Sequence, residues 1–147
     1  MVIEIDVSEN SHDIKIPPLT LQLLIENALK ESIYIEQLMV VGEHQKFATA
    51  LVVPDFSYLR GWCESQHVLN GHDNQTLICV PEVISVFQKE IESVNQTLSE
   101  WEQISRIRIV PDEWTPATGE LSASLKLKRK VLEEKYKEIL DAVYKRQ

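Results

Sequence analysis

Residues 37–53 read QLMVVGEHQKFATALVV, and this stretch decides the predicted fold. Two runs of apolar and often β-branched residues, Gln37–Val41 and Ala48–Val53, flank a polar hexapeptide that begins with Gly42. Short apolar runs separated by a glycine-led turn are typical of a β-hairpin. We therefore predict that these two runs form paired antiparallel strands.

The segments before and after this hairpin show both strand and helix periodicity. Residues 1–7 alternate apolar and polar side chains, and the pattern returns at 14–16, which predicts a short N-terminal hairpin ending at Pro17. Residues 19–31 have helical spacing. After Pro54 we expect a short helix over 55–67, capped by Asp55 or Ser57, and then a loop over 70–75.

The second half of the chain begins with the strongest helical pattern. Over residues 81–104, apolar side chains recur at alternating spacings of three and four, which predicts one long amphipathic helix: Ile84, Phe87, Ile91, Val94, Leu98 and Trp101. Residues 105–110 return to strand periodicity. A final amphipathic helix is predicted from Leu132, Tyr136, Ile139 and Val143. We expect an α+β fold with a small three-stranded sheet flanked by helices, in addition to the N-terminal hairpin.

Length and composition point to an ordinary globular domain. The chain has 147 residues, of which 44% are hydrophobic and 26% charged, and no apolar run is long enough to cross a bilayer. We expect a single domain over 1–147, with residues 1–18 close to a hinge and 19–147 forming the core. The first residues show no secretory signal, and two cysteines fit a reducing compartment, so we expect a cytoplasmic protein.

Charge is divided unevenly along the chain. Residues 1–100 hold 5 Lys and Arg against 15 Asp and Glu, whereas residues 101–147 hold 10 against 8. The net charge of -8 would repel free nucleic acid, so we expect no nucleic-acid partner. Any anion that binds must be met locally, near the C-terminal cations.

Metal and nucleophile motifs do not account for a function. Cys63, His67, His72 and Cys79 are close in sequence, but their spacing matches no standard zinc set, and we expect no metal site. The sequence also has no glycine-rich phosphate loop, nucleophile elbow or paired acid motif.

A cluster of cations is left unexplained at the start of the final helix. Lys126, Lys128, Arg129 and Lys130 fall within five positions. A helix N-terminus favours anions, so local helix stability does not require these cations. They are either a solvated helix start, with lysine stems covering apolar surface, or a site that contacts an anion.

Several short motifs follow one another in the second half of the chain. Their residues are Asn95, Leu98, Glu102-Gln103-Ile104, Trp114-Thr115, Thr118-Gly119-Glu120-Leu121, Ser122-Ala123-Ser124-Leu125-Lys126 and Lys128-Arg129. These motifs and the order of elements resemble the C-terminal subdomain of AMP-forming long-chain acyl-CoA synthetases. The similarity runs from about Leu19 to Tyr144.

The resemblance implies a function for Lys126. In this superfamily a lysine of the C-terminal subdomain reaches over the active site of a larger N-terminal adenylation domain, and the family pattern puts it at Lys126. Its ammonium would stabilise the charge that develops when a fatty carboxylate attacks the α-phosphate of ATP. We expect an extended segment in which Leu125 and Leu127 are anchored and Lys126 points outward. The subdomain then rotates so that the CoA thiol can attack the acyl-adenylate.

The resemblance also implies further contacts and partners. Lys128, Arg129, Lys130, Gly119 and Glu120 are the candidates for contacts with nucleotide or CoA phosphates. ATP, Mg²⁺ and CoA would be bound by the full-length enzyme and not by this domain alone. We expect the partner to be the N-terminal adenylation domain of the same parent chain, and these 147 residues to be inactive in isolation.

The sequence departs from the family pattern in places, and alternatives remain. Ser122-Ala123-Ser124 stands where the family has Thr-Pro-Thr, and no hinge residue is assigned because the glycine-bearing hairpin that opens the family's subdomain has no match before Gly42. One alternative is a free-standing interaction module that kept the fold without catalysis. Another is peripheral contact of the basic cluster with an anionic membrane.

Overall fold

The computed structural model describes residues 2–6, 19–42, 48–66, 73–98 and 103–145. The chain divides into two compact units, which we call unit 1 (Met1–Asp112) and unit 2 (Glu113–Gln147). Whether both act as a single domain in a parent protein stays a prediction.

The hairpin predicted from residues 37–53 is confirmed in unit 1. Strands β2 (Ile35–Val41) and β3 (Ala48–Pro54) pair in antiparallel fashion, with Leu38 opposite Val52. Every residue of β3 is buried, which fits its nearly unbroken apolar sequence. The turn residues 43–47 lie outside the described part of the chain.

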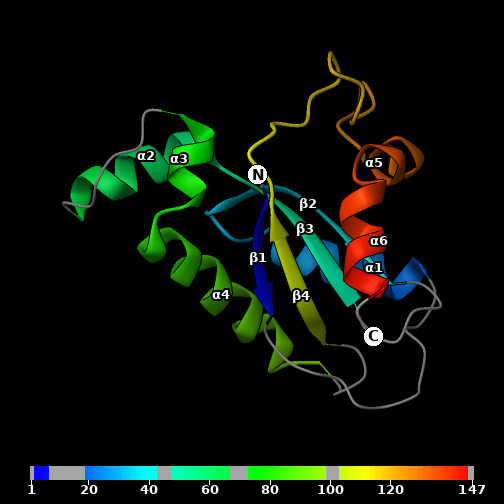
Figure 1. Cartoon of the computed structure of the whole chain (residues 1–147), viewed down its shortest axis with the longest axis horizontal. Coiled ribbons are helices and arrows are strands. Elements are labelled where there is room, and N and C mark those ends of the chain that lie inside the picture. The colour runs from blue at the N-terminus through cyan, green and yellow to red at the C-terminus, as the bar shows by residue number, and fades with distance from the viewer. Residues whose placement is uncertain (1, 7–18, 43–47, 67–72, 99–102, 146–147) are drawn as a thin grey trace. The chain divides into compact units, whose positions relative to one another are not determined.

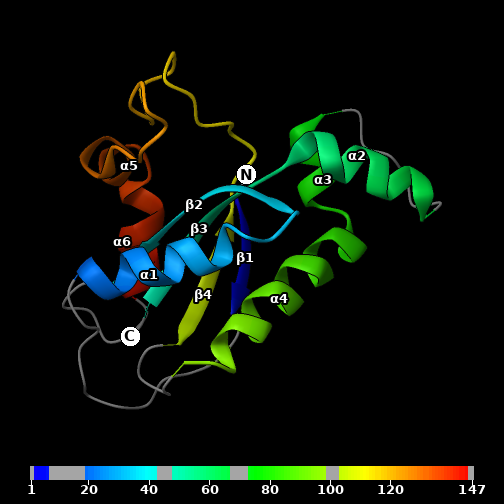
Figure 2. The same cartoon turned by 180° about the vertical axis from the view of Figure 1, so that it is seen from behind.

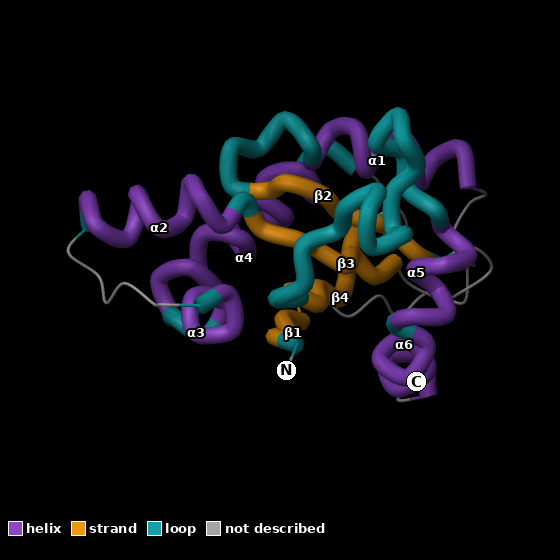
Figure 3. The backbone as a smooth tube through the Cα atoms, turned by 90° about the horizontal axis from the view of Figure 1, so that it is seen from above, coloured by secondary structure: helices purple, strands orange, loops and turns teal. Residues whose placement is uncertain are grey.

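The sheet of unit 1 has four strands, one more than predicted. Strand β4 (Ile104–Ile109) runs parallel to β3, and β1 (Ile3–Asp6) joins the free edge of β4 in antiparallel fashion. The strand order is therefore β1-β4-β3-β2, with β1 and β2 at the edges (Figure 3). The predicted partner of β1, residues 14–16, lies outside the described residues.

Two helices cover the same face of this sheet. Figure 2 shows α1 (Leu19–Leu29) and α4 (Pro81–Asn95) side by side in front of the strands. Ile25 and Leu29 of α1 and Phe87 of α4 are among the buried residues. These side chains, together with the apolar strand residues, form the core of unit 1.

The connection from β3 to α4 contains one helix more than expected. Helix α2 (Phe56–Ser65) begins as predicted, and the Asp55 carboxylate accepts a hydrogen bond of 3.0 Å from the Tyr58 N–H. The prediction of a loop over 70–75 is wrong at its end, because α3 (Asn74–Ile78) starts there. The Asp73 carboxylate caps α3 by accepting from the Thr76 N–H at 2.8 Å.

Helix α4 is shorter than the predicted helix over 81–104. It ends at Asn95, after which the Thr97 and Leu98 N–H groups donate to carbonyls three residues back, at 3.0 Å each. Such tight bonds end a regular α-helix. The buried face also differs from the predicted seam, because Val83 and Asn95 are buried while Ile84 and Val94 are half-buried. Trp101 lies outside the described residues.

Unit 2 contains a long connection and then two helices, α5 (Arg129–Lys135) and α6 (Lys137–Lys145), at the red end of the chain in Figure 1. The prediction of one continuous helix is wrong, because the helix is interrupted at Tyr136. The predicted face is largely preserved across this break, since Leu132, Tyr136 and Val143 are buried. Among all the described residues, no helix has the length and apolar character to span a bilayer.

Candidate functional site

Lys126 lies in a tight loop of unit 2 whose backbone is held at its base and near its tip. At the base, Leu121 and Leu127 form an antiparallel bridge. Nearer the tip, the Ser122 N–H donates to the Lys126 carbonyl at 2.8 Å, and the Ser122 hydroxyl oxygen accepts from the Lys126 N–H at 3.1 Å. We call residues 121–127 the lysine loop. Its hydrogen bonds fix the Lys126 backbone and leave the side chain exposed.

The predicted extended conformation of this segment is wrong at Leu125. Its backbone has φ of 64°, in the left-handed region, and its side chain is 55% exposed instead of anchored. The chain therefore turns at Leu125, and its N–H donates to the Ser122 carbonyl at 2.9 Å. Side chains alternate between two faces only in an extended strand. Because the chain turns at Leu125, the sequence pattern no longer places the Leu125 side chain on a buried face. Lys126 points outward as expected, but from a turn.

A buried acid, Glu120, lies directly before the lysine loop. Its Oε2 accepts from Lys135 Nζ at 3.1 Å, and its Oε1 accepts from the Thr115 N–H at 3.3 Å and from the Thr118 hydroxyl. Glu120 is 3% exposed, so its charge is compensated by these donors rather than by bulk water. The ion pair with Lys135 joins the segment before the loop to helix α5.

The environment of Glu120 determines its protonation. Burial by itself would raise the pKa of the carboxyl, but the hydrogen bonds from Thr118, Lys135 and Thr115, with the charge of Lys135, outweigh burial. The net result is a pKa below the usual value, so Glu120 is ionised at neutral pH. A buried carboxylate would repel a phosphate and has little surface to offer it, so we do not propose Glu120 as a phosphate contact.

Gly119 provides the backbone turn directly before Glu120. Its φ is +95°, a conformation that side-chain-bearing residues rarely adopt, although no atom would crowd an added Cβ. The preceding turn is closed by Thr115 and Thr118, whose hydroxyls lie 2.8 Å apart, and by the Gly119 N–H, which donates to the Thr115 carbonyl at 3.1 Å. Gly119 therefore has a clear backbone role, and its predicted phosphate contact remains untested.

The other predicted contact residues lie at the start of α5. Lys128 and Lys130 are exposed, and Arg129 is half-buried. The Lys128 N–H donates to the Glu120 carbonyl at 2.9 Å, which places the base of the lysine loop next to the helix start. All six predicted site residues lie within positions 119–130 of the sequence, and this hydrogen bond holds the two ends of that segment together.

Sequence reasoning missed the residues that support this segment. Lys135 pairs with Glu120, and its Nζ lies 5.5 Å from the ring centre of Tyr136. The Tyr136 hydroxyl accepts from Trp114 Nε1 at 2.9 Å. Lys135 is 15 positions from Glu120, so neither helix nor strand periodicity links the two residues. Only their opposite charges could have suggested the ion pair.

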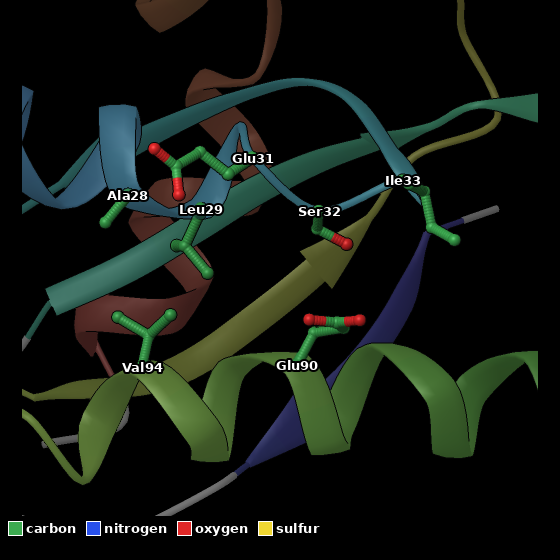
Figure 4. Close-up of a pocket in the computed structure, with 7 residues that line it drawn as sticks. All are labelled: Ala28, Leu29, Glu31, Ser32, Ile33, Glu90 and Val94. Carbon is green, nitrogen blue, oxygen red and sulfur yellow. The ribbon is translucent and has the colours of Figure 1, made fainter.

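A separate concave site lies in unit 1, between the end of α1 and α4. It has a volume of about 340 Å³, and Figure 4 shows Glu90 and Val94 of α4 facing the segment that contains Leu29 and Ser32. Its charged lining residues are the acids Glu31 and Glu90, so it disfavours anionic ligands such as nucleotides or fatty carboxylates. This concave site is therefore a poor candidate for the predicted anion contacts, which all lie in unit 2.

The described residues contain no group of three or more His, Cys, Asp or Glu side chains that could hold a metal ion. Cys63 is buried and Cys79 is exposed. His67 and His72 lie outside the described residues, so the expectation of no metal site stays a prediction.

Comparison with known proteins gives a consistent picture. A family model described as the AMP-binding enzyme C-terminal domain matches residues 15–147. The long-chain-fatty-acid–CoA ligase FadD15 of Mycobacterium tuberculosis is 31% identical over 124 residues, covering 84% of this chain and 21% of the relative. Long chain acyl-CoA synthetase 8 of Arabidopsis thaliana is 29% identical, covering 82% and 17%. The chain thus spans about a fifth of the length of these relatives.

Solved structures share the fold. The adenylation domain of a carboxylic acid reductase from Segniliparus rugosus, in complex with AMP and a co-purified carboxylic acid, has a TM-score of 0.63 and 22% identity. The match covers 85% of this chain and 18% of that one. The adenylation domain of a carboxylate reductase from Mycobacterium chelonae has a TM-score of 0.61 and 24% identity, covering 82% and 17%.

Proposed function

The chain belongs to the family of AMP-binding enzyme C-terminal domains, and from this premise we propose that it is the C-terminal domain of a long-chain fatty acid:CoA ligase. The proposed enzyme activates a fatty acid with ATP to an acyl-adenylate, with release of pyrophosphate, and then transfers the acyl group to CoA, with release of AMP. The N-terminal adenylation domain of the same parent chain is the proposed partner. Fatty acid, ATP and CoA are the proposed substrates.

Lys126 is the proposed adenylation lysine. When the fatty carboxylate attacks the α-phosphate, negative charge accumulates on both reacting groups. An ammonium held between them stabilises the transition state more than the separated substrates. The single observation that supports this role is that Lys126 is exposed on a loop whose backbone is fixed by hydrogen bonds on both sides.

The neighbouring cations have a smaller proposed role. Lys128, Arg129 and Lys130 would attract the phosphates of the nucleotide or of CoA toward the lysine loop. Mg²⁺ would neutralise ATP phosphates in the assembled enzyme. We propose that the partner domain, together with the ATP phosphates, holds this ion.

The test separates the two half-reactions of the full-length enzyme. Lys126→Ala should slow acyl-adenylate formation on the order of 100-fold to 1,000-fold, which is the usual cost of removing one transition-state donor. It should leave thioester formation from supplied acyl-adenylate nearly unchanged. Lys128→Ala is the matched control, because it removes a neighbouring exposed lysine.

The control should slow adenylate formation much less than Lys126→Ala. If Lys126→Ala slows both half-reactions equally, or neither, Lys126 is not the adenylation lysine.

A further inference from the structure

Glu120 occupies the base of the lysine loop through both its backbone and its side chain. Its carbonyl accepts from the Lys128 N–H at 2.9 Å, just beyond the C-terminal end of the loop. Its carboxylate pairs with Lys135 of α5 at 3.1 Å. The next residue, Leu121, is buried and forms the bridge with Leu127. One residue therefore connects the two ends of the loop and the helix that follows it.

The donors to this carboxylate come from both sides of the loop. Thr115 and Thr118 precede it in sequence, and Lys135 follows it. Lys135 is itself held against the Tyr136 ring, and Tyr136 accepts from the indole of Trp114. The Glu120 side chain is 4% exposed, so removal of its charge would weaken the hydrogen bonds that hold these donors to their shared acceptor.

We propose that Glu120 is a positioning residue for Lys126, which fixes the base of the lysine loop so that the ammonium reaches its place in the adenylation step. This inference rests on the proposed function, in which Lys126 acts in that step. Glu120 does not touch the reacting groups. Its effect is geometric, since a displacement of about 1 Å can cost on the order of 100-fold in rate.

The experiment uses the full-length enzyme and the same two half-reactions. Glu120→Gln keeps the shape of the side chain but removes its charge and weakens its hold on Lys135. We expect adenylate formation to slow about 10-fold to 100-fold, with thioester formation from supplied acyl-adenylate unchanged. The matched control is Glu133→Gln, at an exposed acid of α5, which should change neither rate.

A double variant tests whether Glu120 acts through Lys126. In a background that already carries Lys126→Ala, Glu120→Gln should slow adenylate formation no further, because the group that it positions is gone. A purely structural role predicts something different. In that case Glu120→Gln would slow both half-reactions, or would slow adenylation by the same factor with and without Lys126.

Each failure has its own signature. An unchanged adenylation rate in Lys126→Ala contradicts the proposed function. A strong effect of Lys126→Ala with no effect of Glu120→Gln, or with an effect that persists in the double variant, overturns the role of Glu120 alone. If Glu120→Gln does not fold, Thr118→Val decides, because it removes one donor and retains the ion pair. A selective slowing of adenylation by Thr118→Val supports the inference, and an unchanged rate overturns it.

Discussion

At the scale of single residues, Glu120 makes stability depend on pH in a defined direction. Its pKa in the folded chain is below the usual value of about 4.3, so its ion pair stabilises the fold fully above that value. The stability contributed by this ion pair is lost as pH falls through the lower pKa of the folded chain. Because protonated Glu120 resembles glutamine, the wild-type chain can be compared with Glu120→Gln at each pH.

Glu120→Gln should lower the free energy of unfolding by about 1 to 3 kcal/mol near pH 7, where the wild-type carboxylate is charged. The difference should shrink below about pH 4 and vanish once the wild-type carboxyl is protonated. Urea unfolding of both chains across this range measures it. A deficit that is equally large at the lowest pH would show that the charge of Glu120 does not stabilise the fold.

The lysine loop shows what sequence alone predicts at this scale. The motif predicts that Lys126 points outward, and its side chain is exposed, whereas its catalytic role stays a prediction. It does not reveal the left-handed backbone of Leu125, because that conformation comes from hydrogen bonds between Ser122 and residues 125 and 126. Nor does it reveal the role of Glu120, which becomes visible only when Lys135 is brought beside it.

At the scale of elements, Asn95 joins the end of α4 to the start of β4. Its side-chain amide donates to the Ile104 carbonyl and its side-chain oxygen accepts from the Ile104 N–H, each at 2.9 Å. Asn95 is 6% exposed, so both bonds are shielded from water. The amide supplies a donor and an acceptor on two separate atoms, so one side chain satisfies both backbone groups of Ile104.

Asn95→Leu should therefore destabilise the chain by about 2 to 4 kcal/mol, since it leaves two backbone groups of Ile104 without their partners. Thermal or urea unfolding measures the change. Gln96→Ala is the matched control at the adjacent exposed position and should change stability little. A loss of less than about 0.5 kcal/mol in Asn95→Leu would mean that this connection is not important for the fold.

The two cysteines, Cys63 in α2 and Cys79 at the end of α3, should differ in their reactivity toward thiol reagents. Burial raises the pKa of the Cys63 thiol, and the negative charge of Glu82 raises it further, so little reactive thiolate forms. Cys79 is exposed. A thiol reagent should modify one cysteine quickly in the native chain and both in denaturant.

Cys79→Ser should abolish the fast phase and leave the slow one. Fast modification that persists in Cys79→Ser would show that Cys63 is accessible, contrary to its burial in unit 1.

The lengths of elements were harder to predict than their types. The apolar spacing over residues 81–104 continues past Asn95, but the backbone leaves the α-helix there because the next N–H groups bond three residues back. Helix α3 was missed because its polar sequence resembles a loop, although Asp73 carries a capping signal. Periodicity records which side chains are buried, and local hydrogen bonds decide where an element ends.

At the scale of the whole molecule, the sheet explains why the fold class was predictable. The hairpin of β2 and β3 is local in sequence, so the pattern of residues 37–53 was enough to find it. The addition of β1 to β4 joins residues at opposite ends of unit 1, with Ile3 opposite Ile109. No local pattern indicates such a pairing, so the strand predicted within residues 1–7 could not be assigned to this sheet.

The division of charge also belongs to this scale. Unit 1 contains most of the acids and an acidic concave site lined by Glu31 and Glu90, whereas the predicted anion-directed residues are all in unit 2. If this chain contributes one ammonium to a larger active site, as we propose, that ammonium must be held in a defined position. Within unit 2, the backbone hydrogen bonds of the lysine loop and the ion pair of Glu120 with Lys135 are the contacts proposed to hold it.

The measurement that tests this account most directly is the first-turnover rate of pyrophosphate release by the full-length enzyme with Lys126→Ala, in the absence and presence of ethylammonium. We expect a rate on the order of 100-fold to 1,000-fold below wild type, and partial recovery as the added ammonium replaces the missing one. Wild-type pyrophosphate release from the Lys126→Ala enzyme without ethylammonium would contradict the proposed role of Lys126.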